Sequence, residues 1–463
     1  MTQRNITPKT IKADYLVVGA GGMGMAFTDS ILSETEATVA IVDRHHRPGG
    51  HWNTAYPFVR LHQPSAFYGV NSRHLGSDAL DATGWNRGLY ELATNGEVCA
   101  YFDAVMQQQF LPSGRVRYFP MCDYTDEGRI ISQVSGGEIE VSAGKIVDAA
   151  YMNVTVPSMR PPDYEVDDGV VCRPLNDLPK MADRYNHFMI IGAGKTAMDA
   201  CLFLLGNGLD PSRISWVMPR DSWLVNRAKI QPGKLFSDIV VKSFTGQMQA
   251  MAQASCLEEL FAGVVGTGHL LRFDDDVWPT MYRCATVTHA ELDQLRRIEN
   301  IIRKGRVKRL SRDRVEFERS TSPTRPDTLY VDCTADGLAN RPVQPIFGKG
   351  KLTLQSVRTC QQVFSAAFIG HVEASYDDMA LQNELCTPLP HPNTEIDYLR
   401  SSLLNVTNAA RWVRDPELKA WLHNARLDGF TRPDNFENAR GLPEELVRQV
   451  TGNLKRLIAG AEA

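Results

Sequence analysis

Two glycine-rich loops are the residues of this 463-residue chain whose types and spacing point most directly to chemistry. One loop runs over residues 19–24 and reads Gly-Ala-Gly-Gly-Met-Gly, and the other runs over 192–197 and reads Gly-Ala-Gly-Lys-Thr-Ala. Each follows a short apolar run typical of a buried parallel strand and precedes an apolar helix. That arrangement holds a dinucleotide pyrophosphate at a helix N-terminus. Two such loops in one chain predict two nucleotides that exchange electrons.

The first loop stands in a complete strand, loop, helix and strand pattern. Gly19 allows the tight turn, Gly21 lets the backbone approach a pyrophosphate, and Gly24 permits close packing of helix on strand. The second strand ends at Asp43, whose carboxylate can accept hydrogen bonds from ribose hydroxyls. The expected elements are a strand over 14–18, a helix from Met23 to about Ser33 and a strand over 38–42. The predicted cofactor contacts here are Gly19, Gly21, Gly22, Met23, Gly24, Asp43 and Arg44.

The second loop has alanine at its third conserved position, and its second strand ends without an acid. After the strand predicted over 214–218 come Pro219 and Arg220. An arginine where NAD sites place a carboxylate suits a 2′-phosphate, through a charge-assisted contact. The sequence therefore predicts NADPH at this loop. Its predicted contacts are Gly192, Gly194, Lys195, Thr196, Ala197 and Arg220, with Arg227 as a weaker second candidate.

The residues after Asp43 resemble a known family. Arg47-Pro48-Gly49-Gly50-His51-Trp52, followed by Tyr56-Pro57, is similar to a segment of the flavin-containing monooxygenases and their Baeyer-Villiger relatives. The resemblance implies that the first nucleotide is FAD and that Gly50, His51 and Trp52 lie against it, although Trp52 is equally well explained as core. Arg220, Ser222 and Trp223 resemble the family's NADPH-clamping region.

The resemblance implies a single-component flavoprotein monooxygenase. In that family NADPH reduces FAD, and a C4a-(hydro)peroxyflavin formed with O2 oxygenates a small organic substrate at nitrogen, sulfur or carbon, or in a Baeyer-Villiger reaction. The family places polar side chains near the flavin, which makes Gln63 and Asn71 the catalytic candidates after Tyr56-Pro57. His371 follows a predicted last strand of the FAD domain over 366–371 and is a candidate acid or base.

Some of the family pattern is missing. The aromatic-Gly stretch followed by His is absent between Pro157 and Phe188, and the Ala-Thr-Gly positions are altered at 148–151 and 332–337. An FAD-dependent oxidase or dehydrogenase of a small amine or alcohol, with a vestigial second nucleotide site, is therefore the alternative. A non-catalytic nucleotide-binding scaffold is a third option, and no interaction repeat or binding motif supports it.

The predicted fold is α/β, with two Rossmann-like dinucleotide-binding domains and a helical insertion. We expect the FAD domain over 1–157 to be interrupted by the NADPH domain over 158–329 and completed over 330–463. The insertion is expected at about 231–289, with an apolar stripe (Met248, Met251, Leu257, Leu260 and Phe261) that serves packing more than a pocket. The tail from Arg411 is expected to form helices that cover the FAD domain.

Charge and composition exclude several classes of binding partner. A net charge of −4 gives no electrostatic case for nucleic acid or anionic membrane. Residues 1–12 lack the apolar core of a signal peptide, and no apolar run approaches the roughly 20 residues that span a bilayer, so a cytoplasmic protein is expected. Nine singly scattered cysteines argue against a disulfide framework, a zinc site or a CxxC centre, and no metal is predicted. The expected partners are a small-molecule substrate and O2. The sequence does not indicate the oligomeric state, and a homodimer is one option.

Overall fold

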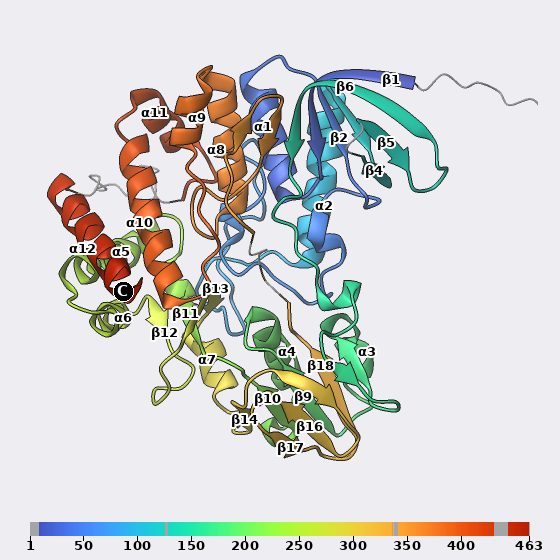
Figure 1. Cartoon of the computed structure of the whole chain (residues 1–463), viewed down its shortest axis with the longest axis vertical. Helices are drawn as coiled ribbons and strands as arrows, with labels where there is room; N and C mark the ends of the chain where they lie inside the picture. Colours follow the sequence, from blue (N-terminus) through green and yellow to red (C-terminus); the bar gives the residue numbers. More distant parts are fainter. Residues whose placement is uncertain (1–8, 126–127, 336, 338–340, 430–442, 463) are drawn as a thin grey trace, which may run out of the picture.

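The computed structural model of the chain describes residues 9–125, 128–335, 337, 341–429 and 443–462 (Figure 1). Residues 1–8, which make up most of the segment tested for a signal peptide, lie outside the described residues, as does Asp336 in the second altered Ala-Thr-Gly position. No helix within the described ranges combines the length and apolar character needed to cross a bilayer.

The first unit is built on a largely parallel sheet with strand order β19-β20-β6-β1-β2-β3. Strands β20, β6, β1, β2 and β3 run parallel to one another, and β19 pairs antiparallel with β20. The short β4 and β5 extend the sheet beside β6 in antiparallel fashion. The bounds are β1 (Lys9–Val18), β2 (Val39–Val42), β3 (Val116–Phe119), β4 (Cys122–Tyr124), β5 (Arg129–Ser132), β6 (Glu138–Asp148), β19 (Phe347–Gly348) and β20 (Lys351–Thr353). Because β19 and β20 come from the last third of the chain, the strands of this sheet come from two separate stretches of sequence.

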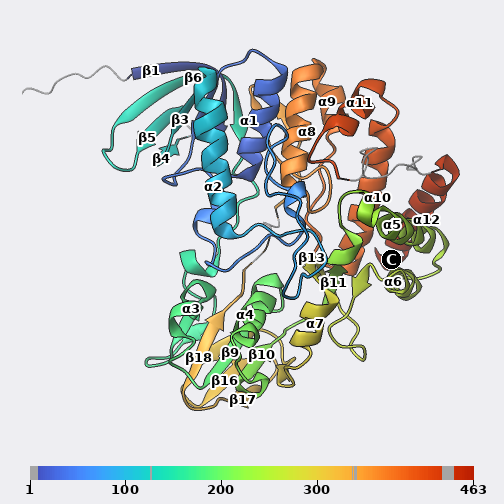
Figure 2. The same cartoon turned by 180° about the vertical axis from the view of Figure 1, so that it is seen from behind.

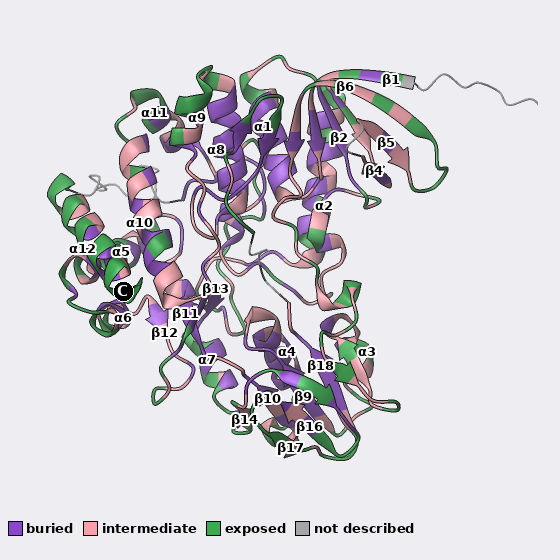
Figure 3. Ribbon diagram, in the orientation of Figure 1, coloured by how far each residue is buried: buried purple, intermediate pink, exposed green. Residues whose placement is uncertain are grey.

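Three helices complete the first unit: α1 (Gly22–Glu34), α2 (Asn95–Val105) and α8 (Gln362–Ser375). Helices α1 and α8 pack closely along each other, and Gly370 permits this because a Cβ there would come within 2.9 Å of the Ser30 Cβ. Figure 3 shows both helices as largely buried. Eleven consecutive residues of α8, Val363–Glu373, are buried, so the helix is enclosed on all sides.

The prediction of a strand over 366–371 was wrong, because these residues lie within α8. A helix that is enclosed all round is apolar all round, and its sequence then shows no 3.6-residue period to separate it from a buried strand. His371 accordingly lies on a helix rather than at a strand end.

The second unit has a five-stranded parallel sheet in the order β14-β10-β9-β18-β8. The strands are β8 (Cys172–Pro174), β9 (His187–Ile191), β10 (Ile214–Val217), β14 (Ile301–Ile302) and β18 (Thr328–Asp332). Helix α4 (Lys195–Gly206) packs on β9 and α7 (His289–Leu295), as the view from behind shows (Figure 2). A smaller sheet of four strands lies alongside. Strand β18 crosses the boundary expected between residues 329 and 330, since it belongs to this sheet.

The small sheet consists of β7 (Glu165–Val166), β15 (Val307–Leu310), β16 (Arg314–Phe317) and β17 (Thr321–Pro323). A short helix, α3 (Leu178–Met181), precedes β9. The two units together give the α/β fold with two Rossmann-like domains that the glycine loops predict.

The insertion carries two helices and a three-stranded sheet. These are α5 (Ser237–Gln253), α6 (Leu257–Gly266), β11 (Ser222–Asn226), β12 (Leu270–Leu271) and β13 (Met281–Val287). Its apolar stripe packs against the C-terminal helices α10 (Glu395–Trp412) and α12 (Glu444–Glu462), where Val450 and Leu454 are buried (Figure 1). The stripe therefore serves packing.

The C-terminal tail covers two parts of the molecule, not only the first unit as expected. Helix α12 packs on α5 and α10, whereas Trp412 and Trp421, the latter on α11 (Pro416–Asn424), pack on Phe364 and Phe368 of α8. The remaining helix, α9 (Met379–Leu385), lies beside α8 and β19.

The cysteines depart from the prediction. Cys284 in β13 and Cys360 just before α8 form a disulfide across 76 residues of sequence. Sequence spacing could not reveal the pair, because the two residues meet only when the insertion folds against the first unit. The other seven cysteines are free.

Candidate cofactor sites

The first glycine loop joins β1 to α1 with the geometry expected of a pyrophosphate cradle. Gly19 has φ +110°, and a Cβ on Gly24 would lie 2.0 Å from the Gly19 carbonyl oxygen, so only glycine lets helix and strand approach this closely. Gly21 faces a second glycine, Gly50, whose own Cβ would lie 2.8 Å from the Gly21 Cα. Two backbone surfaces without side chains thus meet beside the free N–H groups of the first turn of α1.

Asp43 sits at the end of β2, next to this loop. Its carboxylate accepts hydrogen bonds from the backbone N–H of Ala20 (2.6 Å) and of His45 (2.7 Å), and its side chain is buried. The neighbouring Arg44 points outward and pairs with Asp123 at 3.5 Å. Asp43 is therefore held beside the loop, while Arg44 is mainly a surface charge.

The residues after the loop close one side of the cradle. Gly50, with φ +55°, begins a short 3-10 turn over Gly50–Asn53, in which His51 is exposed and Trp52 is buried. The Trp52 indole N–H donates to the Tyr68 hydroxyl at 2.7 Å, and a Cβ on Gly22 would lie 2.9 Å from that hydroxyl oxygen. Trp52 and Tyr68 therefore lie beside the N-terminus of α1.

The three catalytic candidates are not brought together. Asn71 uses its side-chain oxygen to accept the Leu427 N–H at 3.1 Å, and Gln63 is half-buried in the loop that follows Tyr56. His371 lies in α8, where its Nδ1 contacts the Glu34 carboxylate at 2.6 Å and its ring stacks on Trp421 at 4.7 Å. These contacts give His371 a packing role and remove the reason for which it was selected.

The second loop joins β9 to α4 and is open where the first is closed. Gly192 has φ +137°, and a Cβ there would meet the Cys333 carbonyl oxygen at 2.6 Å, which explains the glycine at the turn. A Cβ on Gly194, in contrast, would meet nothing within 4 Å. Ala197 is fully buried under the helix, and Thr196 is half-buried. The backbone at Gly194 therefore leaves space for a ligand at the start of α4.

Lys195 and Asp199 pair with each other one turn apart in α4, and both are largely buried. The other Asp199 oxygen accepts the Tyr56 hydroxyl at 2.6 Å, and Phe58 stacks on Phe203 of the same helix at 4.3 Å. Burial and the nearby Asp199 carboxylate raise the pKa of Tyr56. Residues 54–62, which we call the junction segment, thus connect the first cradle to the helix of the second.

Arginines gather beyond the end of β10. The Asn393 side-chain oxygen accepts from both Arg220 (3.0 Å) and Arg283 (2.8 Å). Partial burial and the positive charges of Arg283 and Arg306 lower the pKa of the Arg220 guanidinium. We call these three side chains the arginine cluster; an anion bound between them would offset the positive charge that disfavours the charged form of Arg220. This is the place where a 2′-phosphate is expected.

Arg227 is committed elsewhere. Its guanidinium is fully buried and contacts the His62 carbonyl (2.9 Å), the Asn86 side chain (3.1 Å) and the Glu291 carboxylate (3.0 Å). Such a side chain holds the junction segment on the second unit and has no surface to offer a phosphate. Trp223 is likewise fully buried, stacked on Phe261 at 4.7 Å, so this part of the expected clamp is core of the insertion.

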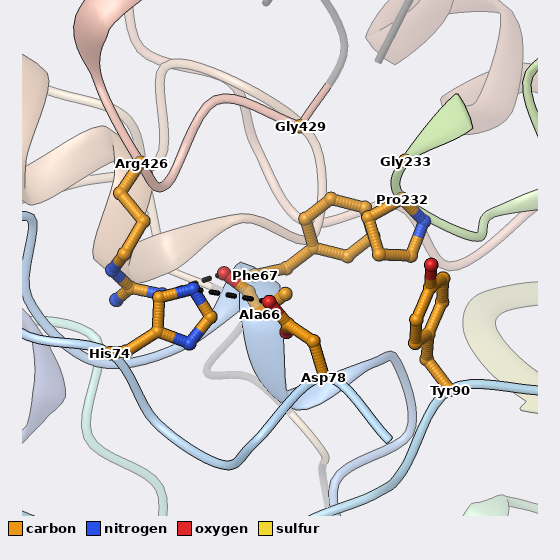
Figure 4. A pocket seen from close by; sticks show the side chains of 9 residues that line it. All are labelled: Ala66, Phe67, His74, Asp78, Tyr90, Pro232, Gly233, Arg426 and Gly429. Carbon is orange, nitrogen blue, oxygen red and sulfur yellow. Dashed lines mark hydrogen bonds and ion pairs between the residues drawn. The ribbon is translucent and has the colours of Figure 1, made fainter. Parts of the chain in front are cut away.

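A cavity of about 110 Å³ lies where the first unit meets the insertion (Figure 4). Tyr90 and Pro232 form one side of it, and His74 and Arg426 form the other. A neighbouring cavity of about 360 Å³ shares His74. Neither is lined by a glycine-loop residue, so neither cavity is part of a cradle. Among the described residues, no group of three or more His, Cys, Asp or Glu side chains is arranged to hold a metal ion.

Sequence reasoning missed several residues that the fold brings to these sites. Asp199, Arg283 and Arg306 were not selected, and only Asp199 left a signal, as an acidic residue four positions after Lys195 on one helix face. Arg283 and Arg306 reach the end of β10 from distant segments, so nothing in local sequence marks them.

Comparisons with known proteins show the relatives of the chain. No family model matches it. It is 53% identical over 421 residues to the uncharacterized proteins Rv2000 of Mycobacterium tuberculosis and Mb2023 of Mycobacterium bovis, an alignment that covers 91% of this chain and 78% of each relative. The chain belongs to the same family as these mycobacterial proteins.

Solved structures of similar fold include the following three. A flavin-containing monooxygenase from Stenotrophomonas maltophilia is 13% identical, with 81% of this chain and 99% of that chain covered and a TM-score of 0.44. An open crystal structure of cyclohexanone monooxygenase is 14% identical, with 81% and 92% covered and a TM-score of 0.48. The bacillithiol disulfide reductase Bdr of Bacillus cereus is 11% identical, with 81% and 99% covered and a TM-score of 0.42.

Proposed function

We propose that this protein is a single-component flavoprotein monooxygenase that binds FAD in the first cradle and NADPH in the second. The observation that supports the proposal most directly is that the junction segment connects the two cradles. This segment follows the turn that begins at Gly50 beside the first loop, and its Tyr56 contacts Asp199, the partner of Lys195 on α4. One stretch of backbone therefore links the two nucleotide sites. Two dinucleotides held this way are suited to hydride transfer between them.

The first cradle fits FAD by its backbone. The facing glycines 21 and 50 allow a pyrophosphate to lie against main chain, the N-terminus of α1 favours its charge, and Asp43 accepts the ribose hydroxyls. Trp52 and Tyr68 are placed to border the ring system. When bound, FAD supplies the acceptance of hydride and the activation of O2 that no side chain provides.

The second cradle fits NADPH by its open backbone and its charge. Gly194 and the first turn of α4 receive the pyrophosphate, and Arg220 with the rest of the arginine cluster receives the 2′-phosphate. Lys195 is held at the start of α4 by Asp199, where its ammonium adds positive charge beside the pyrophosphate.

Gln63 and Asn71 remain our proposed polar groups near the oxygen-reacting centre. Because the Asn71 oxygen is occupied by the Leu427 N–H, its amide nitrogen is the donor it would use. The substrate is a small organic molecule, oxygenated at nitrogen, sulfur or carbon or by Baeyer-Villiger chemistry.

The test is anaerobic reduction of the purified protein, reconstituted with FAD, by NADPH. We expect the yellow absorbance of the flavin to bleach with NADPH and to return on admission of O2, with oxygen incorporated into a sulfide, amine or ketone probe. Isotopically labelled O2 and mass spectrometry of the product measure the incorporation.

Two results would contradict the proposal. A flavin that stays yellow with NADPH but bleaches with an amine or alcohol would indicate an oxidase or dehydrogenase with a vestigial second site. A colourless protein that does not take up FAD would remove the flavoprotein assignment altogether.

A further inference from the structure

The disulfide between Cys284 and Cys360 connects segments that lie near the two cradles, and both cysteines are outside the glycine loops. Cys284 lies in β13, where the pairing with β11 changes register, and directly follows Arg283 of the arginine cluster. Cys360 lies just before α8, whose first-turn residue Val363 would come within 3.0 Å of a Cβ on Gly22 of the first loop. One covalent bond thus ties the phosphate side of the second cradle to the helix that borders the first.

The backbone at both cysteines is unusual in the same way. Cys284 has φ +54° and Cys360 has φ +60°. Among the described residues only three other non-glycine positions have a positive φ, namely Asp78, Met121 and Asp327. A side chain costs energy in this left-handed region, and such conformations are concentrated at functional sites. Both ends of the disulfide therefore lie in strained backbone, which is the kind of position that functional sites often contain.

The two bonded cysteines also lie outside the buried core. Both cysteines are partly exposed, whereas Cys99, Cys122, Cys201, Cys333 and Cys386 are buried. An external thiolate reaches a disulfide between partly exposed residues more readily than one enclosed in a core.

We propose that Cys284 and Cys360 form a reversible thiol–disulfide exchange site whose partner is a small dithiol. A thiolate of the dithiol attacks one sulfur, the Cys284–Cys360 bond breaks, and a mixed disulfide forms. The second thiol of the dithiol then displaces the remaining protein sulfur. The dithiol leaves as a disulfide, and the two cysteines each keep one proton and share the two electrons gained. Oxidation by the reverse route locks β13, and with it Arg283, to the start of α8.

The exchange does not depend on the proposed nucleotide sites and is tested without them. The full chain is incubated in its folded state with or without dithiothreitol, quenched and unfolded in acid, and its free thiols are counted by mass after alkylation. We expect seven tags before reduction and nine after it, with a return to seven on treatment with oxidised dithiothreitol.

Two variants serve as controls. Cys284→Ser frees Cys360 and should show eight tags in every condition. Cys172→Ser removes one of the seven free cysteines and should show six tags and then eight. Nine tags before any reduction would overturn the proposal, because no bond would be present. Seven tags after reduction of the folded protein would also overturn it, because the bond would be a permanent cross-link.

Hydrogen exchange tests what the bond holds in place. Reduction should raise amide exchange several-fold in residues 281–287 and 360–364, while β9, in the middle of the second sheet, stays unchanged. Equal exchange in the oxidised and reduced forms would overturn the inference that the bond locks Arg283.

Discussion

The two glycine loops share a design, yet their surroundings differ. At the first loop Gly21 faces Gly50, the Tyr68 hydroxyl stands beside Gly22, and α1 lies under an enclosed α8. At the second loop the space around Gly194 is open, and a partly buried cluster of arginines stands at the end of the next strand. A cradle closed by its own chain suits a cofactor that stays, and an open and positively charged one suits a nucleotide that comes and goes.

The largest expected effect comes from adding a methyl group to the closed loop. Gly24→Ala places a Cβ 2.0 Å from the Gly19 carbonyl oxygen, so the turn or the helix must move. We expect a loss of about 3 kcal/mol of unfolding free energy, the upper end of ordinary overpacking. Denaturant unfolding measures it.

Gly194→Ala is the matched change at the open loop. Its Cβ meets nothing within 4 Å and its φ is −89°, so stability should change by less than about 0.5 kcal/mol. Comparable losses in the two variants would break the distinction between a closed and an open cradle.

The next effect is on nucleotide choice. Arg220→Ala should raise the KM for NADPH by about 10- to 150-fold more than the KM for NADH, which corresponds to about 1.5–3 kcal/mol for a lost charged hydrogen bond. Arg297→Ala, an exposed arginine bonded to Gln294, is the control and should affect neither cofactor. Equal effects of Arg220→Ala on both cofactors would remove the 2′-phosphate from this position.

Acid should weaken the junction between the cradles. Desolvation, with the positive charges of Lys195 and Arg227, lowers the pKa of His62 to about 3. An unfolded histidine has a pKa of about 6.5, so below that pH the unfolded chain binds one more proton than the folded chain. Unfolding free energy should then fall by about 1.4 kcal/mol per pH unit on acidification from about pH 6 to 4.

His62→Gln should reduce that pH slope by the contribution of one proton. The exposed His46, changed in the same way, should leave the slope as it is. Parallel slopes for His62→Gln and the unaltered protein would show that His62 is protonated alike in both states.

A smaller loss is expected at the contact between the junction segment and α4. Tyr56→Phe leaves one Asp199 oxygen without the phenol donor and should cost about 1 kcal/mol of unfolding free energy. It should also slow flavin reduction by NADPH. Tyr151→Phe removes a hydrogen bond of the same length, to the Pro342 carbonyl, outside the junction, and should leave reduction unaffected.

Local patterns predicted the parts of the fold that local physics determines. The strand before each glycine loop, the two loops and the helices after them follow from apolar runs bounded by glycines that adopt φ angles other residues avoid. The position of the boundary near residue 330 could not be predicted as well, because β18 would be apolar and buried in either sheet.

The rest depends on contacts between distant residues. The helix α8, the Cys284–Cys360 bond, the burial of Arg227 and the approach of Arg283 to Arg220 all arise when separate segments pack. Arg227 and Arg220 look alike in sequence, and only burial separates a side chain that holds two units together from one that can meet a phosphate.

The pairing of α1 with α8 also has a consequence during synthesis. The ribosome must add about 340 residues after α1 begins before α8 begins, which takes roughly 20–70 s at ordinary rates of translation. Throughout that time the face of α1 that α8 later covers, including Phe27, has no permanent partner. The nascent chain therefore presents an apolar surface to chaperones for most of its time on the ribosome. Slower translation of the middle of the messenger RNA would lengthen that exposure.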